Sequence, residues 1–235
     1  MTDSSRDAVR LRPNALRAKY AIAFIWVVMA MEALSLFSSY LQLGLLNSFQ
    51  NGEAISEATA DANDIREALI GLLYLVSYII SAVTFIQWFR RAYFNLGMRV
   101  KPLNESEGMA AGYWFIPIMN LFKPYRMMME LHGRTAELVA PMAPDPVRAR
   151  SQDHITVWWV FWVASNIMGQ VVFRVSGDAN TIDELANSAV ISMVDAALSL
   201  PLAILAVLVI KRYAALEQLL AAWKSPVDQF DEAGR

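Results

Sequence analysis

Four long apolar segments constrain this chain more than any other feature of its sequence. They cover about residues 20–46, 65–89, 155–173 and 188–210. A helix needs about 20 mainly apolar residues to cross the hydrocarbon core of a bilayer. Hydrophobic residues make up 56% of the chain and charged residues only 18%, whereas soluble domains carry about 25% charged residues. The sequence therefore predicts an all-α, polytopic membrane protein with four transmembrane helices.

Lysine and arginine lie almost entirely on one side of these spans. Of the 20 basic residues, 18 fall in the N-terminal arm, in the section between the second and third spans, or after the fourth span. Only Arg66 and Arg174 lie on the other side, where both loops are acidic. Cytoplasmic loops carry an excess of Lys and Arg. We therefore expect a multi-pass protein of the bacterial cytoplasmic (inner) membrane, with a cytoplasmic arm at 1–19, a transmembrane domain at 20–212 and a cytoplasmic tail at 213–235.

Each predicted span carries one stripe of polar or small residues. In the first span the stripe positions follow Glu32 at spacings of three and four, and in the fourth span they surround Asp195. Residues at these spacings share one face of a helix. Small and hydroxylated residues also favour contact between membrane helices. We expect the stripes to meet in a polar core whose candidate members are Glu32, Ser35, Ser39, Ser81, Asn166, Gln170 and Asp195.

Three interpretations of this polar core remain open. The groups can be structural, with Asp195 paired to Arg174; they can form a track for a proton or small solute; or they can line a cavity for a lipid or hydrophobic ligand. Ionisable side chains inside a membrane are costly and mark functional sites or buried pairs. A carrier would need Glu32 and Asp195 to reach water from at least one side, whereas a scaffold would need them sealed and hydrogen-bonded.

The section between the second and third spans contains an apolar stretch, Met109 to Phe122, of 14 residues. This length is too short to cross a bilayer, and Pro117 interrupts it. We expect an interfacial or re-entrant helical elbow at about 106–140, with Trp114 at the headgroup level and the cations Lys123 and Arg126 toward lipid phosphates. Pro124 suits the first turn of a following amphipathic helix.

Two segments carry an unusual motif, FIQWFRRAYFNL at Phe85–Leu96 and SEGMAAGYWFIPIMNLFKPYRMMMEL at Ser106–Leu131. In the order and spacing of these residues the chain resembles the bacterial membrane family catalogued as domain of unknown function 4328. The resemblance implies a multi-span membrane protein without an established activity, and it supplies no catalytic residues. With the adjacent Arg126, the candidate interfacial motif consists of Trp88, Arg90, Arg91, Asn95, Trp114, Pro117, Asn120, Pro124, Tyr125 and Arg126.

Several classes of chemistry lack support in the sequence. The absence of cysteine excludes disulfides, thiolate catalysis and cysteine metal sites. We find no phosphate-binding glycine loop, zinc-protease helix, nucleophile elbow or dinucleotide fingerprint. We expect His132 to be solvated or interfacial and His154 to be a boundary residue rather than a ligand. The basic middle section is better explained by anionic lipids than by nucleic acid. We therefore expect neither an enzyme nor a cofactor.

Two functions from different classes remain. The first is a non-enzymatic membrane protein that serves as a scaffold or binds lipids or a protein partner through its cytoplasmic face. The alternative is a small transporter or proton- or ion-coupled carrier that uses the polar interior around Glu32 and Asp195.

Reporter fusions test the predicted topology. Because basic residues are so unequally distributed, fusions after Gly52 and Gly177 should report an external location, and fusions after Pro141 and Arg235 a cytoplasmic one. A periplasmic signal from the Pro141 fusion would contradict the four-span topology.

Overall fold

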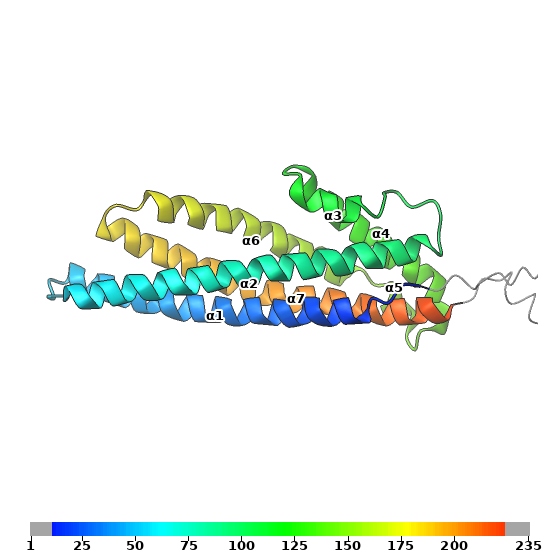
Figure 1. The fold of residues 1–235 in the computed structure, drawn as a ribbon, viewed down its shortest axis with the longest axis horizontal. Helices are drawn as coiled ribbons and strands as arrows, with labels where there is room; N and C mark the ends of the chain where they lie inside the picture. Colours follow the sequence, from blue (N-terminus) through cyan, green and yellow to red (C-terminus); the bar gives the residue numbers. More distant parts are fainter. Residues whose placement is uncertain (1–10, 224–235) are drawn as a thin grey trace, which may run out of the picture. The chain divides into compact units, whose positions relative to one another are not determined.

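A computed structural model describes residues 11–223, and every regular element in that range is helical (Figure 1). Four helices are long and apolar enough to cross a membrane, which confirms the predicted fold class. They are α1 (Ala15–Gln50), α2 (Glu57–Gly97), α6 (Asp153–Asp178) and α7 (Ile182–Ala222). The shorter helices are α3 (Met109–Gly112), η1 (Tyr113–Phe115), η2 (Met119–Leu121), α4 (Lys123–Val139), η3 (Ala140–Met142) and α5 (Pro146–Arg150).

The long helices extend beyond the apolar segments that predicted them. The fourth apolar run ends at Lys211, but α7 continues to Ala222, so the first part of the expected polar tail is helical. Leu and Ala dominate this extension, and both are strong helix formers. The rest of that tail, residues 224–235, lies outside the described residues, as do the first ten residues of the N-terminal arm.

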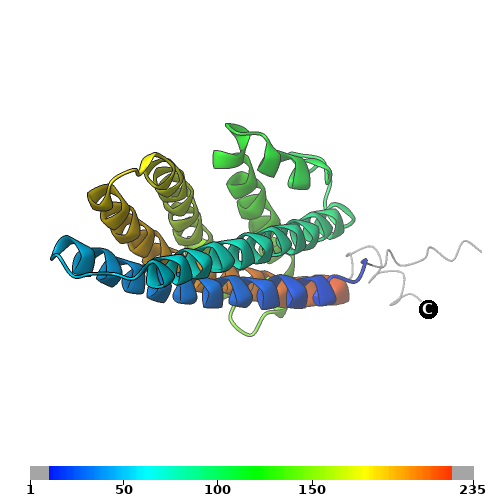
Figure 2. The same cartoon turned by 60° about the vertical axis from the view of Figure 1, so that its left-hand side comes forward.

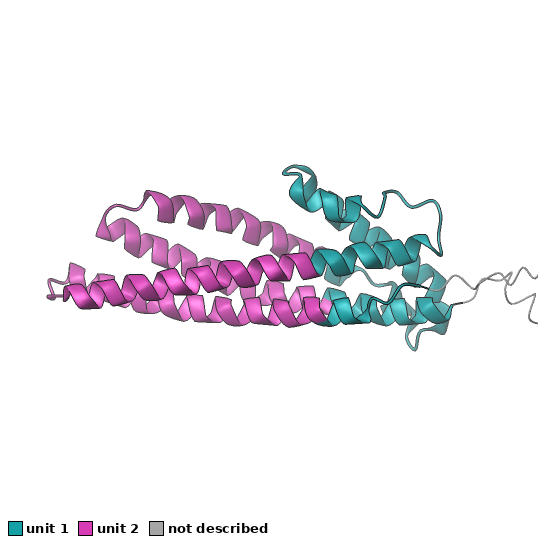
Figure 3. Ribbon diagram, viewed as in Figure 1, with its two compact units in different colours: residues 1–19, 85–155, 209–235 teal, residues 20–84, 156–208 magenta. Residues whose placement is uncertain are grey.

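The chain divides into two compact units (Figure 3). The described part of unit 1 consists of residues 11–19, 85–155 and 209–223, and unit 2 consists of residues 20–84 and 156–208. Unit 1 thus assembles three separate pieces of the sequence. Unit 2 contains the larger part of each of the four long helices, and within it α6 and α7 form a hairpin with a turn at residues 179–181 (Figure 2).

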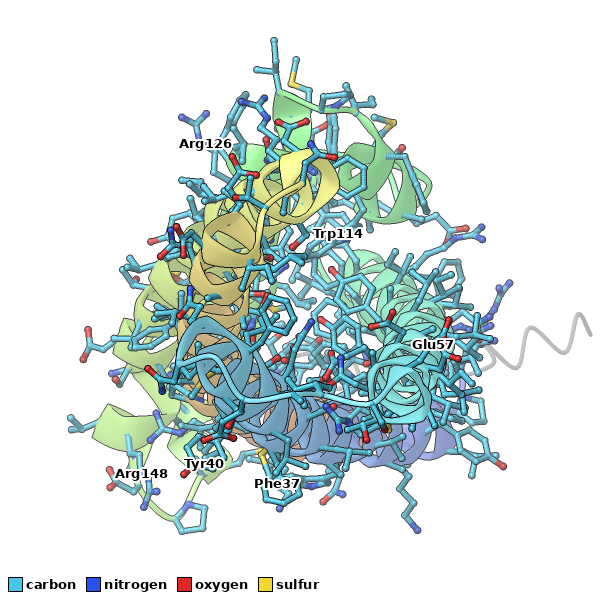
Figure 4. All side chains as sticks on the ribbon, turned by 90° about the vertical axis from the view of Figure 1, so that its left-hand side faces the viewer. Phe37, Tyr40, Glu57, Trp114, Arg126 and Arg148 are labelled. Atoms are coloured by element: carbon cyan, nitrogen blue, oxygen red, sulfur yellow. The ribbon has the colours of Figure 1, made fainter. Side chains whose placement is uncertain are left out.

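The surface of unit 2 is rich in exposed apolar side chains. Phe37 and Tyr40, which are 59% and 62% exposed, project outward from α1 (Figure 4). In α2 the exposed side chains include Leu72, Leu73 and Ile79. Such a surface is expected where helices face lipid, because lipid tails are as apolar as these side chains.

The interior of unit 1 contains a buried hydrogen-bonded network around Glu217 of α7. Asn14 Nδ2 donates to both carboxylate oxygens at 3.1 and 3.0 Å, and Asn95 Nδ2 of α2 donates to Oε1 at 2.8 Å. Asn95 also exchanges two hydrogen bonds with the backbone of Arg12. The network therefore joins the N-terminal arm, the end of α2 and the end of α7.

A second network fixes the loop between α2 and α3. Glu105 accepts hydrogen bonds from Lys123 and from the Tyr113 hydroxyl, and its backbone NH donates to the Tyr93 hydroxyl. Tyr93 in turn donates to Glu130 of α4 at 2.6 Å. The hydrogen bond from Lys123 holds the pKa of Glu105 below its usual value, and the same contact raises the pKa of Lys123. These contacts tie the predicted elbow to α2 and α4.

The helix α4 is amphipathic, and Pro124 lies in its first turn, as the sequence predicted. Its buried stripe packs into unit 1 through Met127, Met128 and Leu131, each at most 2% exposed. His132 also belongs to this buried stripe and is 2% exposed. The expectation that His132 is solvated or interfacial was wrong, because its position three and four residues from buried neighbours places it on the inner face of α4.

Removing the central carboxylate should destabilise the protein. In Glu217→Ala the buried amides of Asn14 and Asn95 lose their acceptor, which should lower the free energy of unfolding by about 1–3 kcal/mol. A thermal melt of the purified protein in detergent measures the effect. Gln218→Ala changes the exposed neighbour on α7 and should melt like the wild type; equal melting of both variants would show that the network contributes nothing.

Candidate functional site

The polar core predicted in the spans forms around Glu32 in unit 2. Glu32 is 5% exposed, and the hydroxyls of Tyr74 in α2 and Ser199 in α7 lie within hydrogen-bonding range of its carboxyl group. Asp195 is close enough to interact with it electrostatically. The stripes of the first, second and fourth spans therefore meet at Glu32, and two hydroxyl groups can hydrogen-bond to its carboxyl group.

Asp195 lies in a different environment from Glu32. It lines a cavity of about 550 Å³ whose other lining residues come from α2 and α6. Its Oδ1 atom is buried and has no hydrogen-bond partner among residues 11–223. The lining residues are Tyr74, Gly169, Val172, Phe173, Ser176, Gly177 and Asp195.

The third span contributes less to the core than its sequence stripe predicted. Asn166 Nδ2 donates to the Trp162 carbonyl of its own helix at 2.8 Å. Gln170 is exposed, so its expected place in the core is wrong. Phe173 is 83% exposed. Spacing fixes which residues share a face of a helix, but not which face of that helix meets its neighbours.

The remaining predicted core residues are serines of α1 and α2. Ser39 and Ser81 are 6% and 8% exposed, whereas Ser35 is half-buried. The proposed pair between Asp195 and Arg174 is absent from the ion pairs of residues 11–223, and Arg174 is exposed. Arg174 lies four residues after the exposed Gln170 in α6, so the two side chains lie on the same exposed face of the helix.

The candidate interfacial motif lies in unit 1 and has two different parts. Trp88 and Asn95 are at most 1% exposed and belong to the packed interior of the unit. Trp88 packs edge to face on Tyr213 of α7 with ring centroids 6.0 Å apart. Arg90 and Arg91 lie at the surface; Arg90 pairs with Glu107 at 3.0 Å, and Arg91 is within electrostatic range of Arg90.

The elbow makes a specific contact with α2. The Trp114 ring lies edge to face against Phe85 and Phe89, with centroids 5.6 and 6.3 Å apart. Both phenylalanines belong to the last turn of the predicted second span, before Arg90 and Arg91. The elbow is therefore level with the end of the apolar part of α2.

The tip of the elbow is an exposed apolar edge, formed by Phe115, Ile116, Ile118 and Leu121 at 76%, 42%, 72% and 47% exposure. Pro117 within it is exposed, Asn120 is half-buried, and Arg126 is exposed and points away from the unit (Figure 4). Pro124 is buried and Tyr125 half-buried. The motif thus combines interior residues with an exposed apolar edge followed by the exposed cation Arg126.

Sequence reasoning missed two polar clusters. In unit 2, Ser38 is 1% exposed and bonds both Arg66 and Glu67 of α2. In unit 1, the His132 and His154 rings lie 5.1 Å apart, and Arg212 Nη1 is 3.0 Å from His154 Nδ1. The sequence carries no signal for either cluster, because each combines residues that are far apart in the sequence. Only the burial of these residues in the structure reveals them. Among residues 11–223, no three His, Asp or Glu side chains gather closely enough to hold a metal ion.

The His132 site predicts sensitivity to acid. Burial, followed by the nearby His154 and Arg212, lowers the pKa of His132 to about 4 from an unfolded value of 6.5. As the pH falls below 6.5, the unfolded chain binds a proton that the folded protein excludes. Stability should therefore fall by up to ~1.4 kcal/mol per pH unit until about pH 4. His132→Leu should melt with a smaller loss between pH 7 and pH 5 than the wild type.

The control for this measurement is Arg126→Gln, which changes an exposed residue of the same helix. It should keep the acid sensitivity of the wild type. If His132→Leu loses stability with acid as steeply as the control, His132 is not the titrating group.

Comparison with known proteins identifies one family. The family model described as "Domain of unknown function (DUF4328)" matches residues 51–215, which is more than half of the chain. No curated protein and no solved structure matches the chain. The matched region contains α2, the elbow, α6 and most of α7, so it includes both parts of the interfacial motif and Asp195. The chain is a multi-pass membrane protein that belongs to the DUF4328 family.

Proposed function

We propose that the protein is a non-enzymatic scaffold of the bacterial inner membrane whose unit 1 lies on the cytoplasmic leaflet and binds anionic lipid headgroups there. The contact of Trp114 with Phe85 and Phe89 carries this proposal. It aligns the elbow with the end of the apolar part of α2, where the bilayer interface would lie. Tryptophan is enriched at that level in membrane proteins.

The exposed edge of the elbow supports the same placement. Phe115 and Ile118 are more than 70% exposed, and an apolar edge of this kind gains free energy when it leaves water at ~25 cal/mol per Å² of buried area. Arg126 follows within one turn of α4 and is exposed. An apolar edge with an adjacent cation matches a leaflet with anionic headgroups.

Unit 1 is also internally braced in the way a scaffold requires. The Glu217 network joins three chain segments, and the Glu105 and Glu130 contacts hold the elbow on α2 and α4. A braced elbow loses little conformational entropy when it binds a leaflet, which favours binding. The exposed face of unit 1 away from the elbow is where a cytoplasmic protein partner would dock.

The alternative carrier function receives less support from Glu32. A relay residue must exchange protons with water, but Glu32 is 5% exposed and has two hydroxyl groups within hydrogen-bonding range. This arrangement favours a structural role for Glu32 in helix packing.

Single-cysteine labelling tests the elbow directly, because the chain has no cysteine of its own. In proteoliposomes, a spin label on Ile118→Cys should be more accessible to oxygen than to a water-soluble nickel complex. The matched control is Val147→Cys, an apolar residue of unit 1 that is 81% exposed in α5, and its label should favour the nickel complex. An Ile118 label with the accessibility of the Val147 label would refute the placement.

Lipid retention tests the headgroup contact. Native mass spectrometry of the purified protein should show fewer bound phosphatidylglycerol molecules in Arg126→Gln than in Arg148→Gln, which removes an exposed cation of α5. Equal retention of phosphatidylglycerol by both variants would argue against lipid binding at the elbow. It would indicate only nonspecific attraction of the lipid to surface cations.

A further inference from the structure

The cavity beside Asp195 has a mixed lining within unit 2. Val172 and Phe173 make part of it apolar, Tyr74 adds an aromatic ring with a hydroxyl group, and Asp195 supplies a carboxyl group. Its volume of about 550 Å³ falls within the ~300–1,000 Å³ range of small-molecule sites. A cavity with apolar walls and a few polar groups is the usual form of such a site.

The carboxyl-bearing side chain of Asp195 in the lining distinguishes this cavity from a purely apolar packing gap. Its Oδ1 is buried without a hydrogen-bond partner among residues 11–223, and an unpaired buried polar atom is destabilising. Glu32 is an internal comparison, because Tyr74 and Ser199 lie within hydrogen-bonding range of its carboxyl group. Of the two carboxyl groups, the one that lines the cavity is the one with an unpaired oxygen.

The lining also indicates which chemistry would complete the site. A metal ion such as Ca²⁺ needs six to eight oxygen ligands, whereas the only side chains with oxygen atoms in the lining are those of Asp195, Tyr74 and Ser176. An ammonium group needs fewer contacts: it can donate to the carboxylate and lie against an aromatic ring. The apolar walls then suit a hydrocarbon chain attached to that ammonium group.

Two glycines belong to the lining of the cavity. A Cβ atom added at Gly169 or at Gly177 would meet no atom within 4 Å, although both residues line the cavity. Larger side chains at these positions would occupy the space that the glycines leave free.

We propose that the cavity lined by Tyr74, Gly169 and Asp195 binds an amphiphile that carries an ammonium group, with the ammonium on Asp195 and the chain along Val172 and Phe173. The ammonium can belong to a membrane lipid, as in phosphatidylethanolamine, or to a soluble organic cation. This site is independent of the elbow, which lies in unit 1.

Equilibrium binding of a matched probe set tests the site. The full-length protein is placed in nanodiscs of phosphatidylglycerol, which has no ammonium group, and binding of radiolabelled dodecylammonium is measured against empty nanodiscs. Saturable binding of dodecylammonium, without saturable binding of dodecanol, is the expected result. Equal binding of dodecanol would overturn the proposal, because the two probes differ only in the group that meets Asp195.

Variants assign the binding to the cavity. Asp195→Asn should weaken dodecylammonium binding by at least about tenfold, since it removes the charge and keeps the shape. Gly169→Leu should abolish binding by filling the cavity. Gly71→Leu is the matched control, because Gly71 also has no atom within 4 Å of an added Cβ but lies outside the lining, and it should bind like the wild type.

Folding is checked for each variant by its thermal melt. If Asp195→Asn does not fold, the Gly169→Leu and Gly71→Leu pair still decides the matter, since both keep Asp195. Wild-type binding by Gly169→Leu, or equal loss in Gly169→Leu and Gly71→Leu, would overturn the proposal.

Competition identifies the source of the ammonium group. Adding phosphatidylethanolamine to the nanodiscs should displace dodecylammonium if the site holds a lipid headgroup. Binding that persists unchanged in phosphatidylethanolamine would assign the site to a soluble organic cation. Displacement of dodecylammonium by dodecanoate would contradict the charge selectivity expected of Asp195 and would overturn the proposal.

Discussion

The buried carboxyl group of Glu217 is the interaction on which unit 1 depends. It accepts hydrogen bonds from Asn14 and Asn95, and so connects segments separated by 203 and 122 positions in the sequence. A carboxyl group removed from water is stable only when hydrogen bonds replace its hydration. Both amides are fixed in turn, Asn95 by the backbone of Arg12 and Asn14 by the Trp88 carbonyl. The ends of α1, α2 and α7 are therefore held in one packed body.

The elbow packs against this part of unit 1. Phe85, Phe89 and Tyr93 lie on α2 beside the residues that surround Glu217, and each contacts the elbow or the loop before it. The apolar tip can then remain exposed without collapsing onto the unit. Glu105, Glu130 and Glu217 of unit 1 accept hydrogen bonds from other segments of the unit. In unit 2, Glu67 accepts a hydrogen bond from Ser38, whereas Oδ1 of Asp195 has no partner among residues 11–223. The hydrogen-bonded acids therefore stabilise the fold, and Asp195 is the acid to which we assign a ligand.

The candidate site was predictable only in part. The helical spacing of polar residues pointed to Glu32 and Asp195, which the structure brings within electrostatic range of each other. The same spacing failed for α6, where Gln170 is exposed. A stripe fixes a face of one helix, but the rotation of that helix depends on packing with its neighbours. The pair of Asp195 with Arg174 failed for the same reason, and the cavity could not be foreseen because it is a gap between three helices.

The sequence by itself determined that this chain crosses a membrane four times, that Met109–Phe122 is too short to be a fifth span, and that Pro124 lies in the first turn of an amphipathic helix. Hydrophobic length and helix-start residues act locally, so they can be read along the chain. Only the tertiary structure decided that three separate segments form unit 1, that His132 is buried and that Glu217 is central. These features arise from contacts between residues far apart in the sequence, whose partners are chosen by packing and by the need to hydrogen-bond every buried polar group.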